Sequence, residues 1–403
     1  MKKIKEGAIL VTLPIVVLRR GKQHQVENGH PWIYNTEVDH IEGSVEPGGL
    51  VDVVNHRNYY IGRGYINPRS KILVRLLTRV AEPIDRAFFR DRLLRAWHYR
   101  QKVVKEPEYC RLVFSEGDFL PGLIIDRFGG HFVLQTLALG MDRYKDLIVE
   151  LLVELFHPIS IYERNDVPVR RLEGLPSTKG LLYGEHPPAL VPVLENGLKM
   201  VADPVNGQKT GFFYDQRENR ASLAPFFPGA TVLDCFCHTG SFSIHAAAYG
   251  AKDVLAVDIS ADALAVAKCN AEANGVADRC RFEEANAFNL LRDYSDAGRQ
   301  FDVVILDPPA FTKSRSTLEA AARGYKEINL RGLKLTKPGG ILVTCSCSYH
   351  MDADLFLAIV LDAARDTKKT VRQIEYRTQA KDHPILPASP ETQYLKFLVL
   401  EVW

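Results

Sequence analysis

The carboxyl-terminal half of the chain alternates short apolar strands with helices, and this alternation limits the folds open to it. Strands are expected over residues 231–234, 254–258, 301–307 and 341–344, and helices over 241–249, 261–274, 317–335 and 352–364. Residues 394–402 alternate like a final strand. Strands that alternate with helices in this way form βαβ units on a mostly parallel sheet. An α/β fold is therefore predicted for this part of the chain.

The rest of the chain contains two regions with different sequence patterns. Residues 1–80 contain short β-rich runs separated by Gly and Pro turns, which is typical of a small β-barrel. Residues 81–190 mix an arginine-rich helix, a pair of strands around Gly129-Gly130 and an apolar helix, and Pro187-Pro188 marks a linker. We predict three domains, at residues 1–80, 81–190 and 191–403.

Charge and cysteine content indicate the class of protein. The net charge of +2 conceals a basic first part: residues 1–80 carry 12 Lys/Arg against 7 Asp/Glu, or +5. A local basic patch suits a phosphate backbone, although charge taken alone favours ordinary solvated surface. Seven scattered cysteines, an odd number, favour reduced thiols over a disulfide framework.

The same considerations favour a cytoplasmic protein. No run approaches the roughly 18 apolar residues of a membrane span. Residues 9–17 are partly apolar after a basic start, but Pro14 interrupts them, Arg19-Arg20 follows, and no small-residue cleavage site is present. A signal peptide is therefore not expected.

A nucleotide site is expected where the first strand of the α/β part ends. Asp234 is followed by a turn that reaches Thr239-Gly240, and a helix begins at Ser241. Asp258 ends the next strand, where an acid can accept both hydroxyls of a ribose. A dinucleotide dehydrogenase would need the G-x-G-x-x-G glycines, but Phe236 and His238 stand there. A purely structural loop remains the alternative.

Two further strand ends supply reactive groups. One is Asp307-Pro308-Pro309, and the other holds Cys345 and Cys347. A thiolate that adds to carbon 6 of cytosine makes carbon 5 nucleophilic, and a carboxylic acid at ring nitrogen 3 favours the addition. In the usual strand order, Asp307 would lie between the cofactor and the cysteine across roughly 10 Å of sheet. The target base must leave its stack to enter.

Metal binding is the rival interpretation of the cysteines. Cys235-x-Cys237 and Cys345-x-Cys347 are two pairs, but zinc requires sulfurs within about 4 Å of one another. A whole strand separates the pairs, and C-x-C is shorter than the usual spacing. Spacing alone also leaves a structural role open for either Cys345 or Cys347.

These motifs resemble the family of PUA-domain-containing 23S ribosomal RNA cytosine-5 methyltransferases over nearly the whole chain. The resemblance rests on motifs at residues 19–22, 29–34, 116–123, 206–220, 307–309 and 346–348. It implies a PUA β-barrel, a small α/β linker domain and a class I Rossmann-like methyltransferase domain. It also implies S-adenosyl-L-methionine as cofactor and large-subunit ribosomal RNA as partner. The sequence leaves the oligomeric state open, with a homodimer as one option.

The resemblance also assigns site residues. It implies that Cys347, seven residues after Gly340, is the nucleophile and that Asp307 orients or protonates the base. It implies that the Gln208–Arg220 segment folds over the cofactor. The expected cofactor residues are Gln208, Thr210, Gly211, Arg217, Asp234, Phe236, Thr239, Gly240, Ser241, Asp258, Ile259, Asn286 and Ala287. The expected RNA contacts are Arg19, Arg20, Lys22 and His30.

Two positions depart from the usual pattern. Asn286 stands where an acid often meets the adenine amino group, and its amide oxygen can accept that hydrogen bond only without charge assistance. Ala310 stands where many cytosine-5 RNA methyltransferases carry a second cysteine, so the base that completes release is unassigned. Two other functions remain: methylation of another RNA atom, and a non-catalytic RNA-binding protein that keeps the fold.

Overall fold

The chain forms two compact units in a computed structural model that describes residues 13–312 and 314–403. The first unit runs to Arg100 and adds residues 111–186 and 385–390. The second contains residues 101–110, 187–384 and 391–403. The three-domain boundaries expected at residues 80/81 and 190/191 stay a prediction. The basic start that suggested a leader, with residues 9–12, lies outside the described residues.

The first unit begins with a six-stranded sheet whose strand order is β2-β6-β5-β4-β1-β3. Its inward side chains include Val16, Ile33, Val53 and Val74, all fully buried. The short β-rich runs expected in residues 1–80 form strands, among them β4 and β6. The elements are β1 (Ile15–Leu18), α1 (His24–Glu27), β2 (Trp32–Tyr34), β3 (Val38–Glu42), β4 (Leu50–Val54), β5 (Tyr60–Ile66) and β6 (Ile72–Thr78).

A second sheet in the same unit has the order β11-β10-β9-β8-β7. Helices α2 and α4 supply Phe89, Leu93, Ile148 and Leu151 to one continuous apolar core with it. The elements are α2 (Arg86–Val103), β7 (Tyr109–Phe114), β8 (Leu123–Phe128), β9 (His131–Thr136), α3 (Leu139–Asp142), α4 (Lys145–Phe156), β10 (Ser160–Asn165) and β11 (Thr178–Gly184).

The second unit is built on a seven-stranded sheet with the order β16-β15-β14-β17-β18-β20-β19. The pairs from β16 to β18 are parallel, and β20 joins antiparallel to both β18 and β19. The predicted α/β class is confirmed, as is the placement of β17 between β14 and β18. The strands are β14 (Thr231–Cys235), β15 (Asp253–Asp258), β16 (Cys280–Glu284), β17 (Phe301–Leu306), β18 (Thr336–Ser346), β19 (Val371–Arg377) and β20 (Lys396–Val402).

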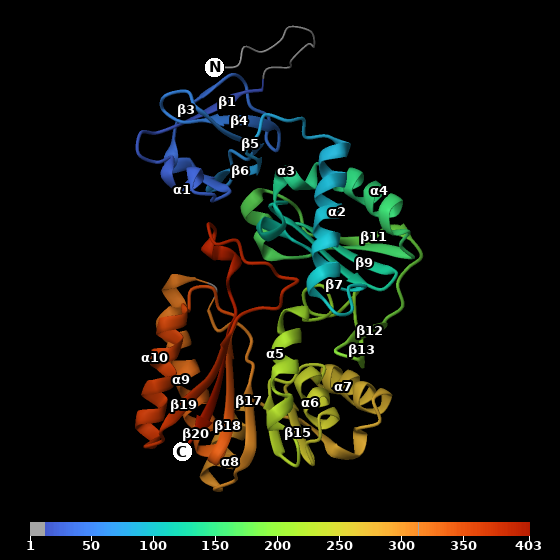
Figure 1. The fold of residues 1–403 in the computed structure, drawn as a ribbon, viewed down its shortest axis with the longest axis vertical. Coiled ribbons are helices and arrows are strands. Elements are labelled where there is room, and N and C mark those ends of the chain that lie inside the picture. The colour runs from blue at the N-terminus through green and yellow to red at the C-terminus, as the bar shows by residue number, and fades with distance from the viewer. Residues whose placement is uncertain (1–12, 313) are drawn as a thin grey trace. The chain divides into compact units, whose positions relative to one another are not determined.

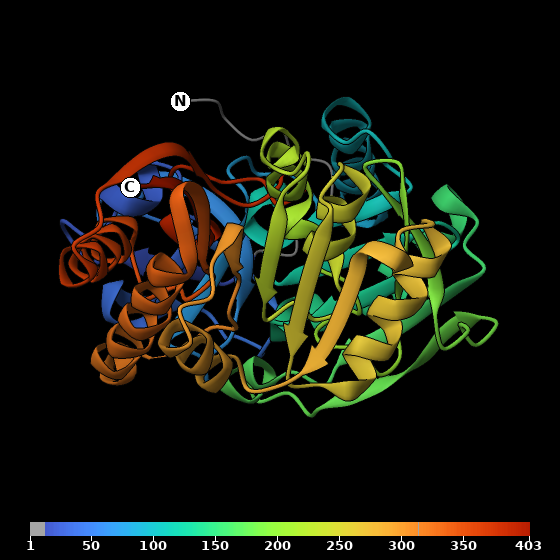
Figure 2. The same cartoon turned by 90° about the horizontal axis from the view of Figure 1, so that it is seen from below.

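Helices cover this sheet and bury its apolar core. Figure 1 shows α9 and α10 together beside β18 to β20, and Figure 2 shows β14, β15 and β16 as adjacent yellow-green to gold arrows. A separate hairpin of β12 (Val191–Glu195) and β13 (Leu198–Ala202) precedes the sheet. The helices are α5 (Arg217–Ser222), α6 (Ser241–Ala248), α7 (Ala261–Ala273), α8 (Ala287–Asp296), α9 (Leu318–Leu335) and α10 (Ala353–Thr367).

The parallel strands bring residues far apart in the sequence to one edge. Cys235 lies opposite Leu306 on β17, and Leu306 lies opposite Thr344 on β18. The loops that follow β14, β17 and β18 therefore leave the sheet at the same edge. No helix in the described part of the chain is long and apolar enough to cross a membrane.

Candidate active site

The turn after β14 is tightly folded. Phe236, His238 and Gly240 all have positive φ, at +65°, +50° and +76°. The first two carry side chains that disfavour this conformation, a kind of strain that concentrates at functional sites. Gly240 begins α6, and a Cβ on it would come within 2.9 Å of the Ala267 Cβ. Glycine at position 240 therefore lets this turn pack closely against α7.

Asp234 enters the turn as a buried acid that is only half satisfied. Its Oδ2 accepts a hydrogen bond from the Ser243 hydroxyl at 2.5 Å. Its Oδ1 is buried and accepts no hydrogen bond from the described residues. Burial raises the pKa of Asp234 to about 7, and the nearby Asp307 and Asp258 carboxylates add to the shift. A buried acceptor without a donor fits a polar ligand group at this place.

Replacing Asp234 with asparagine should stabilise the protein at about pH 8. The pKa of Asp234 is higher in the folded state than in the unfolded state. Its contribution to the free energy of unfolding is therefore fully present below about pH 4 and is lost as pH rises through about 7. The loss amounts to roughly 4 kcal/mol or less. Asp234→Asn avoids it, so its melting temperature should exceed that of the wild type at about pH 8 and approach it at low pH. An equal difference at both pH values, measured by calorimetry, would contradict the shift.

The end of β15 offers a second acid beside the same turn. The Asp258 carboxylate accepts hydrogen bonds from the His238 and Ser260 backbone N–H groups, at 2.8 and 3.0 Å. Each oxygen keeps a further lone pair, so both can still accept ribose hydroxyls. The neighbouring Ile259 side chain is 69% exposed. This arrangement matches the predicted ribose position and leaves an apolar surface next to it.

Asn286 and Ala287 lie after β16. The Asn286 amide oxygen accepts from the backbone N–H groups of Phe288 and Asn289, which makes Asn286 the N-cap of α8. Ala287 is buried. The amide oxygen predicted to meet the adenine is therefore already engaged, and the Nδ2 group is the donor left for a ligand.

The segment that starts at Gln208 reaches the turn through aromatic contacts. The Lys209 ammonium lies 4.6 Å from the centre of the Phe213 ring, and that ring meets His238 edge-on at 5.1 Å. Thr210 is buried, and its hydroxyl has no partner among the described residues. Gly211 has φ +112°, and a Cβ there would lie 2.3 Å from the Asp203 carbonyl oxygen. The structure thus brings Thr210, Gly211 and the exposed Gln208 beside the predicted cofactor turn.

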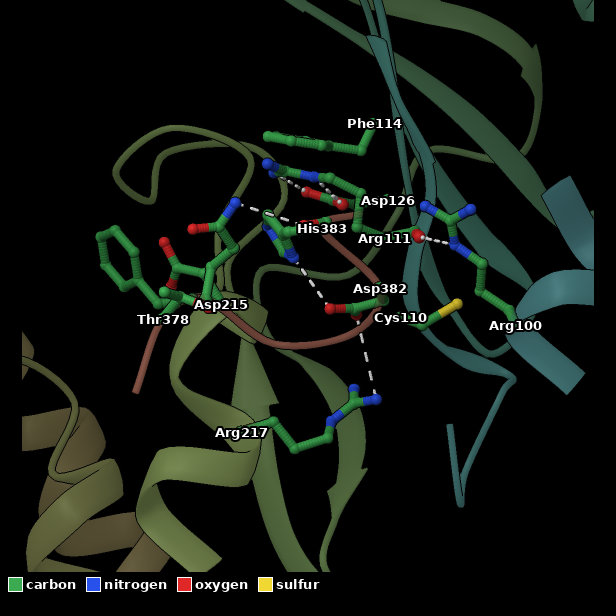
Figure 3. Close-up of polar contacts among 12 residues, drawn as sticks. Arg100, Cys110, Arg111, Phe114, Asp126, Asp215, Arg217, Thr378, Asp382 and His383 are labelled. Carbon is green, nitrogen blue, oxygen red and sulfur yellow. Dashed lines mark hydrogen bonds and ion pairs between the residues drawn. The ribbon is translucent and has the colours of Figure 1, made fainter. Parts of the chain in front are cut away.

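Arg217 is buried among partners that lie outside the Asp234–Ser241 turn. Its guanidinium donates to the Tyr109 carbonyl oxygen and lies 3.8 Å from Glu195 and 3.9 Å from Asp382. Figure 3 shows Arg217 pointing to Asp382, which also pairs with His383 at 2.8 Å. The Arg217 Nε and Nη1 atoms have no hydrogen-bond partner among the described residues. The cofactor contact expected for Arg217 therefore stays a prediction.

Asp307 directly follows β17 and is held by an oriented amide. Gln216 donates from Nε2 to Asp307 Oδ1 at 3.1 Å, and Asn219 donates to Gln216 Oε1 at 2.7 Å. The second bond fixes which end of the Gln216 amide faces the acid. Burial raises the pKa of Asp307 to about 6, and the Asp215 carboxylate raises it further. An acid with this pKa can exchange a proton near neutral pH.

The two cysteines after Thr344 have different surroundings. Cys345 is completely buried on β18 opposite Phe397, and burial raises the pKa of its thiol well above the ordinary value. Cys347 follows the strand, is half-buried, and its Sγ lies 4.0 Å from the Pro308 carbonyl oxygen. Burial raises the pKa of Cys347 to about 11, while the Lys209 ammonium opposes the shift. Of the two, Cys347 is the one that a substrate can reach beside Asp307.

The serines on either side of Cys347 share one anchor. The phenol of Tyr325, fully buried on α9, lies 3.0 Å from the Ser348 hydroxyl and accepts a hydrogen bond from Ser346 at 3.0 Å. Both neighbours of the thiol are therefore fixed to the same group. Sequence reasoning missed Tyr325, because nothing local relates a tyrosine on a helix to a loop after the next strand.

A buried lysine holds the same loop from the other side. Lys396, opposite Ser346 in the β18–β20 ladder, donates from Nζ to the Ser348 and Tyr394 carbonyl oxygens at 2.8 and 2.7 Å. Burial lowers the pKa of Lys396 to about 8. We call Tyr325 and Lys396 the thiol brace. A lysine that opens an otherwise mostly apolar strand was the one sequence signal available for it.

The predicted RNA contacts lie in the first unit and divide into two groups. Arg19, Arg20 and Lys22 are exposed on one turn, closed by a hydrogen bond from the Lys22 N–H to the Arg19 carbonyl oxygen. His30 is fully buried, and its Nδ1 accepts from the Trp32 backbone N–H at 3.1 Å. A direct RNA contact is therefore not supported for His30, which shapes the backbone before Trp32.

Metal-binding geometry was also sought. Among residues 13–312 and 314–403, no group of three or more His, Cys, Asp or Glu side chains is arranged to hold a metal ion. Cys235 and Cys237 are buried, and in both cases burial raises the pKa of the thiol well above its ordinary value. These two thiols are therefore protonated at neutral pH.

Two known families match parts of this chain. A PUA-like domain family matches residues 16–79, and the S-adenosylmethionine-dependent methyltransferase family matches residues 176–398. The predicted PUA-like domain and methyltransferase domain are thereby confirmed.

Relatives match over nearly the full length. Ribosomal RNA large subunit methyltransferase I of Shewanella denitrificans is 44% identical over 393 residues, which cover 96% of this chain and 99% of the relative. The protein of the same name from Aliivibrio fischeri is 43% identical over 385 residues, which cover 94% of this chain and 97% of that relative.

Solved structures with the same fold are more distant in sequence. A SAM-dependent methyltransferase from Streptococcus mutans superposes with a TM-score of 0.80 at 19% identity, covering 96% of this chain and 99% of the other. A methyltransferase solved in complex with SAH superposes with a TM-score of 0.82 at 19% identity, again covering 96% of this chain and 99% of the other. These similarities confirm the Rossmann-like methyltransferase fold.

Proposed function

This chain belongs to the family of S-adenosylmethionine-dependent methyltransferases that includes ribosomal RNA large subunit methyltransferase I, and we propose that it methylates carbon 5 of a cytosine in large-subunit ribosomal RNA. The cofactor is S-adenosylmethionine. The observation that carries the proposal is the half-buried Cys347 thiol beside Asp307-Pro308, at the same sheet edge as the Asp234 turn.

The residues of the turn hold the cofactor in this proposal. Asp258 accepts the ribose hydroxyls, the unpartnered Asp234 Oδ1 accepts from the methionine end, and Ile259 packs on the adenine. The backbone from Phe236 to Ser241 closes around the ligand, and Gln208, Thr210 and Gly211 cover it. Asn286 and Ala287 border the adenine.

Cys347 and Asp307 carry the chemistry. The Cys347 thiolate adds to carbon 6 of the cytosine, and ring nitrogen 3 takes a proton from the Asp307 carboxyl. Carbon 5 then has enamine character and is a nucleophile. The cofactor supplies an electrophilic methyl group, which carbon 5 accepts. Loss of the carbon-5 proton to a base restores the double bond and expels the thiolate, and ring nitrogen 3 returns its proton to the Asp307 carboxylate.

The thiol must ionise for this to begin, and two ammonium groups favour that ionisation although the pKa of Cys347 is raised overall. The Lys209 and Lys396 ammonium groups lower the pKa of Cys347, against the effects of burial, Asp307 and Asp215. The basic turn of Arg19, Arg20 and Lys22 contacts RNA phosphates in this proposal. Shape and backbone contacts would dominate there, while the unstacked target base is read at the site.

Nucleoside mapping tests the proposal. Large-subunit ribosomal RNA treated with the enzyme and cofactor should yield 5-methylcytidine on digestion and mass analysis. RNA that contains 5-fluorocytosine should trap a denaturant-stable protein–RNA complex, because the fluorine on carbon 5 cannot leave as a proton does. A methylated ring or amino nitrogen would establish the alternative chemistry. Steeply salt-dependent RNA binding with no methyl transfer would indicate a non-catalytic protein.

A further inference from the structure

Phe119 in the first unit combines two unusual properties. It has φ +59°, a left-handed conformation that is strained for a bulky side chain, and its side chain is 53% exposed. Packing in the core does not explain it, since more than half of the side chain is open to solvent. Strain at an exposed aromatic residue therefore calls for another reason.

The turn that carries Phe119 is rigidly held. Arg100, with no exposed surface, pairs with both oxygens of the Asp118 carboxylate, the Nη2–Oδ2 bond measuring 2.7 Å. Asp118 Oδ2 also accepts from the Phe114 backbone N–H at 2.6 Å. The Ser115 hydroxyl accepts from the Gly122 N–H at 2.7 Å. These bonds fix the backbone on both sides of Phe119, so the ring projects from a rigid turn.

An arginine stacks beside the ring. The Arg92 guanidinium lies 5.7 Å from the centre of the Phe119 ring and 5.0 Å from that of Phe88, and it donates to the Leu77 carbonyl oxygen at 3.4 Å. No carboxylate of the described residues lies within salt-bridge distance of it. The nearest acid on its own helix, Asp91, pairs with Arg95 at 2.7 Å. The positive charge of Arg92 is thus left for an anionic partner.

Contacts between neighbouring elements extend this surface. Trp32 Nε1 donates to Glu116, three residues before Phe119, at 2.8 Å. Arg79, which follows β6, donates to the His30 carbonyl oxygen at 3.4 Å. Within the described chain Arg79 likewise has no carboxylate at salt-bridge distance. We call Trp32, Arg79, Arg92 and Phe119 the Phe119 platform.

We propose that the Phe119 platform binds RNA, with an unstacked base on the Phe119 ring and adjacent phosphates at Arg79 and Arg92. This inference rests on the proposed function, because it takes RNA as the substrate. Aromatic rings stack on any base, and arginine both stacks and pairs with phosphate. An open ring beside Arg92, with Arg79 reaching the backbone before Trp32, meets both requirements, since neither arginine has a carboxylate at salt-bridge distance among the described residues. The platform is separate from the basic turn of Arg19, Arg20 and Lys22.

Phe119→Gly gives the sharpest test, because glycine accepts φ +59° without strain. We expect its melting temperature to be at least that of the wild type. It should also exceed the melting temperature of Phe119→Ala, because alanine keeps the backbone strain. Both variants should bind a short unstructured RNA roughly tenfold more weakly by fluorescence anisotropy, and Phe119→Trp should bind normally. A fluorescent purine in the RNA should lose its stacking signal with Phe119→Gly.

Two comparisons make the result decisive. Tyr183→Ala, which removes a 41% exposed ring on β11, should leave RNA affinity unchanged. Arg92→Gln should weaken binding and reduce the salt dependence by about one phosphate contact. Wild-type affinity in Phe119→Gly, or an equal loss in Tyr183→Ala, overturns the inference. Failure of the wild type to make 5-methylcytidine would refute the proposed function instead and leave these binding results intact.

Discussion

Cys347→Ala should lose methyl transfer by about three orders of magnitude or more, since the route through carbon 6 then has no nucleophile. It should also fail to form the denaturant-stable complex with RNA that contains 5-fluorocytosine. Binding of cofactor and of RNA should stay close to wild type, because the thiol is half-buried and its hydrogen bond to the Pro308 carbonyl oxygen is long, at 4.0 Å. Denaturing gel shift and nucleoside analysis measure the two losses.

Cys345→Ala is the matched control for this result. It removes a thiol two residues away that is fully buried on β18. It should lower the melting temperature through lost packing, yet keep covalent trapping and 5-methylcytidine formation. If Cys345→Ala abolished covalent trapping while Cys347→Ala kept it, the nucleophile would be Cys345 and the assignment of Cys347 would be wrong.

Asp307→Asn should reduce kcat/KM by about 100- to 10,000-fold, the usual contribution of a positioned proton donor. The amide keeps the shape and can still bond Gln216, but it has no proton to give to ring nitrogen 3. Asp302→Asn is a suitable control, because Asp302 lies at the opposite end of the same strand and pairs with Lys337 at 2.7 Å. Its loss should affect stability more than turnover.

The pH dependence of kcat/KM shows whether Asp307 donates a proton or only orients the base. The acid must be protonated and the thiol ionised, and their pKa values are about 6 and about 11. Below about 6 the acid stays protonated while thiolate rises with pH, so kcat/KM rises. Between the two values the gain in thiolate cancels the loss of acid, and the profile is flat. Asp307→Asn should remove the break near pH 6, and a retained break would mean that another group donates the proton.

Most of the fold was predictable because its pattern is local. The predicted strands at 231–234 and 254–258 coincide with β14 and β15 within a residue, since buried parallel strands are short apolar runs. The edge strand β19 was not predicted. Most of its side chains are exposed or only partly buried, so it lacks the apolar pattern that identifies a strand. The β12–β13 hairpin was missed as well.

The site was predictable where it depends on strand ends. Asp234 lies next to the last residue of β14, Asp307 and Cys347 directly follow β17 and β18, and parallel pairing brings the three to one edge. The RNA contact predicted for His30 failed, because residue type does not reveal that a histidine is fully buried inside its own unit. The cofactor contact predicted for Arg217 stays a prediction. Tyr325 and Lys396 were missed because they reach the Cys347 loop only through tertiary packing.

The thiol brace has a consequence for how such an enzyme could arise or be engineered. A cysteine grafted into the equivalent loop of a nitrogen-methylating domain would lack the phenol that fixes both flanking serines and the ammonium that secures the loop. Such a sulfur would sample many orientations and attack a pyrimidine rarely. Acquiring carbon methylation therefore demands joint change in a helix before the loop and a strand after it. Transplantation experiments should move all three positions together.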